Sequence, residues 1–148
     1  MKLAIKSTSN IDEMTDRLGD DVRGGLVAGT TNVCETAGAL IDKDTPVATS
    51  NLVNSRTVEV SEDGRRGVIR WLADYGRYLI EGTGLFGPRK QKITPKRAKA
   101  LKTPYGPRKS VKGIRPNDFI TRGAEKLDAQ DAFETGMGNY LKKKGWTK

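Results

Sequence analysis

The segment from Gly82 to Asn117 most constrains how this chain can fold, because it contains no acidic residue and holds five of the six prolines. Its eleven basic residues are Arg89, Lys90, Lys92, Lys96, Arg97, Lys99, Lys102, Arg108, Lys109, Lys112 and Arg115. The rest of the chain has 16 basic and 18 acidic residues, so the whole formal charge of +9 comes from this segment. Charges of one sign at this density disfavour burial, and prolines disfavour helices and central strands. We therefore predict an exposed basic arm over residues 82–117 that contacts an acidic partner.

The composition argues against catalysis and against metal binding. The chain has no histidine and a single cysteine, Cys34. Histidine is the usual general base at neutral pH and the commonest metal ligand, and structural zinc sites need several cysteines or histidines. We expect no catalytic residue, no cofactor and no metal, and we expect Cys34 to pack inside a helix. Asp12, Asp16 and Asp20 share one helical face, but such a run is more typical of a solvated surface than of a cation site.

The bulk properties predict one modest domain without a membrane span. Hydrophobic residues make up 35% of the 148, so we expect a single domain over residues 1–141 that completes its apolar burial against other subunits. No apolar run approaches the roughly 20 residues that cross a bilayer. One cysteine cannot form an internal disulfide, which favours an intracellular origin. The basic segment 142–148 is predicted to be a mobile tail.

A long N-terminal helix is predicted from Asn10 to Asp44. Its apolar positions recur at steps of three and four residues, which is the period of one helical face. The predicted buried face consists of Ile11, Met14, Leu18, Val22, Leu26, Gly29, Val33, Ala37, Leu40 and Ile41. Five interior glycines weaken this helix by about 1 kcal/mol each. Three outcomes remain open: the helix forms on a packing surface, where its small residues permit close approach by a neighbour, it breaks near Gly24 and Gly25, or it is merely a weak helix.

The remaining pattern predicts a small, mainly antiparallel sheet and a C-terminal helix. Alternating residues around 57–60 and 68–71, joined by a polar turn over 62–66, indicate a hairpin. A short helix follows up to Gly82. Within the arm we expect two short strands, around 100–102 and 110–112. A last amphipathic segment over Phe119–Leu141 has Ile120, Ala124, Leu127, Phe133, Met137 and Leu141 on its expected buried side. The fold class is therefore α+β, with a long helix packed on a small sheet and an extended basic loop.

Several short motifs, taken in order, are similar to a known family. They are Thr49–Ser55 after the long helix, Tyr75–Pro88 with Glu81-Gly82-Thr83-Gly84 at its centre, and Gly113–Ala124 after the basic loop. This order resembles the neck, or head–tail joining and tail-completion, proteins of long-tailed double-stranded DNA bacteriophages. The matching positions that the resemblance marks as structural are Leu52, Ser55, Tyr75, Tyr78, Gly82, Thr83, Gly84, Pro88, Pro116 and Phe119.

The residues of these motifs also have simple structural interpretations. Leu52 is expected in the core and Ser55 in a turn or at a strand edge, and Tyr75 and Tyr78 are expected to be core aromatics. Gly82-Thr83-Gly84 lacks the Lys-Ser/Thr that completes a phosphate-binding loop, so we interpret it as a flexible exit into the arm. Phe119 is expected to anchor the return of the arm to the core.

The resemblance implies a structural virion protein at the head–tail interface, assembled in the cytoplasm of the bacterial host. Its implied partners are copies of itself in a homo-oligomeric ring, with six subunits favoured over twelve. It also implies contacts with neighbouring head-completion or portal-side proteins and with tail-tube or terminator proteins. In such a ring, the basic arm of one subunit faces either the acidic helix of the next or, non-specifically, the phosphates of DNA in the channel.

Two other functions remain open at the level of the sequence. A tail terminator, which caps the finished tail tube, would share the same ring-forming requirements. A free nucleic-acid-binding protein without sequence specificity would fit the pI of about 9.8. Against the latter, the arm contains only Phe86 and Tyr105 as residues on which bases could stack.

Overall fold

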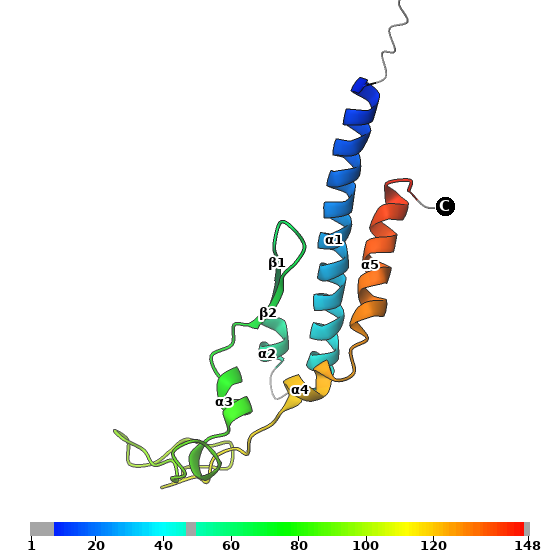
Figure 1. Cartoon of the computed structure of the whole chain (residues 1–148). Helices are drawn as coiled ribbons and strands as arrows, with labels where there is room; N and C mark the ends of the chain where they lie inside the picture. The colour runs from blue at the N-terminus through cyan, green and yellow to red at the C-terminus, as the bar shows by residue number, and fades with distance from the viewer. Residues whose placement is uncertain (1–7, 47–49, 147–148) are drawn as a thin grey trace, which may run out of the picture. The chain divides into compact units, whose positions relative to one another are not determined.

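The computed structural model describes residues 8–46 and 50–146, and it confirms the α+β class (Figure 1). The elements in chain order are α1 (Thr8–Asp44), α2 (Asn51–Asn54), β1 (Arg56–Val60), β2 (Gly67–Trp71), α3 (Gly76–Glu81), the 3-10 turn η1 (Gly84–Phe86), α4 (Phe119–Ala124) and α5 (Ala129–Lys143). The chain divides into two compact units. The first unit comprises three segments: the residues up to Ala39, the hairpin residues Val58–Ile69, and the residues from Lys126 onward. The second unit comprises Leu40–Thr57 and Arg70–Glu125. Both α1 and the hairpin contribute residues to both units.

Helix α1 is unbroken over its 37 residues, so the predicted alternative of a break at Gly24 and Gly25 is wrong. Helix α5 runs beside α1 in the first unit (Figure 1), and its large side chains occupy the space above the α1 glycines. A Cβ on Gly25 would lie 3.2 Å from Met137 Cγ, and one on Gly29 would lie 2.7 Å from Phe133 Cε2. The glycines therefore permit the close approach of a neighbouring helix, and packing offsets their low helix propensity.

The β1–β2 hairpin packs on α1 as well. The two strands form the predicted antiparallel sheet, with no third strand in the described part of the chain. The hairpin turn contains Gly64, where φ is 69°, and a Cβ there would lie 2.5 Å from Val27 N. Cys34 lies against Gly67 of β2 and is only 7% exposed, which confirms that it packs inside a helix.

The predicted buried face of α1 is wrong at its N-terminal end. Met14, Leu18 and Val22 are exposed, and every residue from 13 to 20 is exposed. Gly29, Ala37 and Ile41 are buried as predicted, whereas Leu26, Val33 and Leu40 are half-buried; the side chain of Ile11 lies outside the described residues. The reason is coverage, because the large α5 side chains meet α1 from Gly24 onward.

The second unit has a small core of its own. Ile41, Leu52 and Phe119 are buried together, and Trp71, Ala73, Leu79 and Ile120 pack against them. Asp42 lies at the edge of this core. Its carboxylate accepts hydrogen bonds from Arg56 Nε at 2.8 Å and from Trp71 Nε1 at 3.1 Å. The pairing explains how a carboxylate is accommodated beside an apolar cluster.

The last amphipathic segment is two helices rather than one. Helix α4 ends at Ala124, and α5 begins after Asp128, whose carboxylate accepts from Asp131 N at 3.0 Å as an N-cap. Of the expected buried side, Ala124 is exposed, and the other five residues are half-buried.

The start of the predicted tail continues α5 and contacts α1 within the first unit. Lys142 and Lys143 belong to α5. Beyond the helix, Lys144 Nζ lies 3.5 Å from Asp21 Oδ1, and Trp146 Nε1 donates to Asp21 Oδ2 at 2.8 Å. These bonds hold the pKa of Asp21 below its ordinary value, with the Trp146 hydrogen bond as the largest cause. Residues 147–148 lie outside the described residues.

Candidate functional site: the basic arm

The eleven cations of the basic arm have no negative partner within the described residues. All eleven side chains are exposed. Cations outside the arm do form ion pairs with carboxylates, among them Arg17, Arg56, Arg77, Arg122 and Lys144. One arm cation has an aromatic contact, because Arg115 Cζ lies 5.2 Å from the centre of the Phe86 ring. The arm therefore presents its charge to solvent, as predicted from the sequence.

The two strands predicted inside the arm are wrong. The structure has two isolated antiparallel bridges instead, Ile93 with Val111 and Leu101 with Arg108. Ile93 and Val111 exchange both backbone hydrogen bonds at 3.0 Å, and Leu101 and Arg108 exchange theirs at 2.7 and 2.9 Å. Pairing does not spread into a ladder because the intervening prolines cannot donate, and like charges along both sides repel. The arm is thus a long loop pinned at two points.

The base of the arm is a hydrogen-bonded clasp rather than the flexible exit predicted. We use the name arm clasp for residues 82–85 together with 112–117. Thr83 N donates to Ile114 O at 2.9 Å, Leu85 N donates to Lys112 O at 2.8 Å, and Ile114 N donates to Thr83 Oγ1 at 2.9 Å. The outgoing and returning segments of the arm are therefore hydrogen-bonded to each other at the base of the arm.

Glycines make this clasp possible. Gly82, Gly84 and Gly113 have φ of 74°, 63° and 93°, a region that other residues rarely adopt. A Cβ on Gly82 would also lie 2.8 Å from Pro116 Cδ. The signal in the sequence was the pair Gly82 and Gly84 on the outgoing side and Gly113 on the returning side. Their partnership was not readable because about thirty residues separate the two sides.

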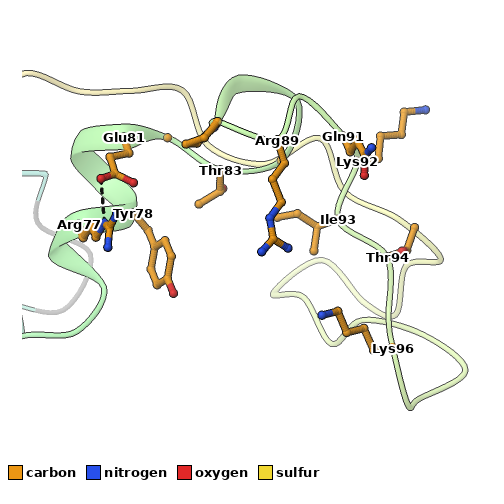
Figure 2. A pocket seen from close by; sticks show the side chains of 14 residues that line it. Arg77, Tyr78, Glu81, Thr83, Arg89, Gln91, Lys92, Ile93, Thr94 and Lys96 are labelled. Atoms are coloured by element: carbon orange, nitrogen blue, oxygen red, sulfur yellow. Dashed lines mark hydrogen bonds and ion pairs between the residues drawn. The ribbon is translucent and has the colours of Figure 1, made fainter.

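A cavity of about 590 Å³ lies at the base of the arm, between α3, the arm clasp and the first turns of the arm. Its lining includes Arg77, Tyr78 and Glu81 of α3 and Arg89, Lys92 and Lys96 of the arm (Figure 2). Arg77 Nε donates to Glu81 Oε1 at 2.8 Å, and this contact raises the pKa of Arg77. We call this space the arm-base cavity. The sequence did not predict it, because its walls come from three segments.

The motif residues divide into core and surface positions. Leu52 is 2% exposed and Phe119 is 1% exposed, so both are core residues as predicted. Ser55 lies in the turn before β1, where its hydroxyl donates to Leu52 O at 2.7 Å and accepts from Ala73 N at 3.1 Å. Pro116 packs against Gly82, and Pro88 lines the arm-base cavity.

The prediction that Tyr75 and Tyr78 are core aromatics is wrong. Tyr75 is 38% exposed and Tyr78 is 57% exposed. Helix α3 is only six residues long, and Leu79 is the residue that it packs against the core of the second unit. Tyr78 instead borders the arm-base cavity.

Burial raises the pKa of the Cys34 thiol, with nearby Glu35 adding to the shift, so the thiol stays protonated at neutral pH. No group of three or more His, Cys, Asp or Glu side chains in the described ranges is placed to hold a metal ion. None of the helices in those ranges is both long and apolar enough to cross a membrane.

Comparison with protein-family models, with curated proteins and with solved structures finds no match to this chain. The arm, the arm clasp and the arm-base cavity are therefore the features from which we infer a function.

Proposed function

We propose that this protein is a non-catalytic structural subunit that forms a ring at the head–tail junction of a long-tailed double-stranded DNA bacteriophage. In this role it joins portal-side proteins to the tail around the DNA channel. The observation that carries the proposal is the basic arm, with eleven exposed cations that have no acidic partner among the described residues. Such a surface is electrostatically complementary to a negatively charged neighbour. The order of motifs around the arm supports the choice of a neck protein.

The structure of the arm fits a docking element better than a free nucleic-acid-binding domain. The arm clasp sets the position at which the arm leaves the body, and the arm has no helix that could enter a groove of DNA. Closed rings need a contact between two different surfaces of the same subunit. A chain with a basic arm and an acidic helix offers two such surfaces. The ring we propose is a hexamer.

Electron microscopy of particles assembled without this protein tests the proposal. We expect DNA-filled heads to accumulate beside separate tails of normal length, because the junction cannot form. Tails of uncontrolled length would instead identify a tail terminator. Intact, infectious particles would contradict the proposal.

Charge reversal in the arm tests whether its exposed cations are needed for assembly. Lys96→Glu, Arg97→Glu and Lys99→Glu together should block assembly of complete particles while leaving the monomer folded, because all three side chains are exposed. Circular dichroism of the purified variant checks the fold, and complementation of particles that lack the protein checks assembly. A variant that assembles normally would contradict the proposed role of the arm.

The eleven cations also favour a second candidate, a free nucleic-acid-binding protein without sequence specificity. Affinity of the isolated wild-type monomer for a DNA oligonucleotide would then fall steeply with salt, because phosphate contacts release counterions. We expect weak binding under the neck proposal. Tight, salt-sensitive binding combined with intact particles in its absence would favour the second candidate.

A further inference from the structure

The arm-base cavity concentrates unpaired positive charge around an exposed aromatic ring. Four cations and one carboxylate line it, and the carboxylate of Glu81 is already paired with Arg77. In Figure 2 the guanidinium of Arg89 and the ammonium of Lys96 extend into the space that the Tyr78 ring borders, whereas Lys92 extends away from it. Two cations that converge on one space without an acidic partner suit an oxyanion.

The shape and walls of the cavity favour carboxylates on side chains over the phosphates of duplex DNA. Its volume of about 590 Å³ is in the range of ligand-binding sites, and the cavity is partly open to solvent. Pro88, Ile93 and Tyr78 add apolar wall, which suits the stem of an acidic side chain. A duplex is too wide to enter such a cavity and would contact only outward-facing cations such as Lys92.

A surface of the same chain offers matching charge. Residues 13–20 of α1 are all exposed, and among them Glu13, Asp16 and Asp20 follow i, i+3, i+7 spacing. This spacing places the three carboxylates on one face of the helix, over a length of about 10 Å. None of the three forms an ion pair with another described residue.

We propose that the arm-base cavity is a receptor for carboxylate side chains, and that a second copy of this chain occupies it with Glu13, Asp16 and Asp20. The inference rests on the proposed ring, for which it names the contacting surfaces. The contact joins two different surfaces, so it propagates from subunit to subunit until the ring closes. Arg89 and Lys96 bind the carboxylates, and Tyr78 covers their apolar stems.

Zero-length carbodiimide cross-linking tests the contact, because it joins an amine to a carboxylate only when they touch. Full-length protein labelled with light and heavy nitrogen is mixed in equal parts, concentrated until light scattering shows oligomers, cross-linked and digested. We expect mixed-isotope peptides that join Lys96 to Asp16 or Asp20. Cross-links confined to single-isotope peptides, or mixed-isotope peptides that join Lys109 in place of Lys96, would overturn the inference.

A charge swap tests the energetics. Arg89→Glu with Lys96→Glu should weaken self-association at least about tenfold, and Asp16→Lys with Asp20→Lys should do the same, because each creates like-charge contacts. All four substitutions together should restore association to within about threefold, because the interacting pairs are reversed as a set. Two losses that simply add in the quadruple variant would overturn the inference.

Arg108→Glu with Lys109→Glu is the matched control, because both side chains are exposed arm cations outside the arm-base cavity. This pair should leave self-association within about threefold of wild type. If Arg89→Glu with Lys96→Glu lowers affinity for a DNA oligonucleotide and leaves self-association unchanged, the cavity binds nucleic acid and the inference fails.

The inference and the proposed function can fail separately. Separate heads and tails in particles lacking the protein, together with no Lys96 cross-link to α1, would leave the neck role standing and remove only the self-contact. The expected cross-link together with intact particles lacking the protein would retain the self-contact and remove the neck role.

Discussion

The α1–α5 contact and the basic arm show two different ways of holding a chain in place. Between the helices, glycines of α1 lie under Phe133, Met137 and Tyr140, so order comes from close side-chain packing. In the arm the cations are exposed, and order comes from backbone hydrogen bonds at the arm clasp and at two isolated bridges. The first arrangement uses its side chains for stability. The second leaves its charged side chains exposed to solvent.

The comparison can be tested most strongly with one residue type in two environments. Phe119→Ala should lower the free energy of unfolding by about 3–5 kcal/mol, because the ring is 1% exposed and its removal leaves a cavity. Phe86→Ala in the arm should cost only about 1–2 kcal/mol, since Phe86 is 37% exposed and the ring is only partly buried. Urea denaturation measures both variants. Similar losses would show that the arm has a core of its own.

A pair of glycine substitutions tests the packing of α1. Gly29→Ala should destabilise by about 1–3 kcal/mol, because the new methyl would lie 2.7 Å from Phe133 Cε2. Gly19→Ala should stabilise by up to about 1 kcal/mol, because nothing lies within 4 Å and alanine favours the helix. Urea denaturation measures the free energy of unfolding of each variant, and the sign of its change relative to wild type tests the prediction. If both variants gain stability, α5 does not hold α1 as closely as described.

The arm clasp can be opened locally. Gly113→Ala places a side chain at a φ of 93°, against the Thr83 carbonyl, at a local cost of about 1–3 kcal/mol. Hydrogen exchange at the amides of Thr83, Leu85 and Ile114 should accelerate while the core amides remain protected. Gly106→Ala is the control, because its φ is also positive, at 98°, and nothing lies within 4 Å. Equal acceleration in both variants would argue against the clasp.

The smallest expected effect concerns Asp21. Its pKa in the folded protein lies below the ordinary value of 3.8, so its contribution to stability is present above that value and is lost as the pH falls through the folded pKa. Asp21→Asn should therefore lose most stability relative to wild type at neutral pH and progressively less below about pH 4. Urea denaturation at several pH values measures this difference. A constant difference across the range would contradict the assignment.

Local patterns in the sequence were enough to predict the main helices and strands and the solvent exposure of the arm. The charge and proline content of residues 82–117 predicted exposure correctly, and the three- and four-residue period predicted α1 correctly. The turn over 62–66 between alternating residues predicted the hairpin. These properties follow from backbone preferences and from the cost of burying charge, which neighbouring residues largely determine.

Only the tertiary structure decided which surfaces are covered. Met14, Leu18 and Val22 have the period of a buried face but are exposed, because α5 covers α1 only from Gly24 onward. The arm clasp and the arm-base cavity join segments that are distant in the sequence. A repeating pattern shows that a face can be buried, but burial requires a partner surface, and that partner is specified by residues elsewhere in the chain.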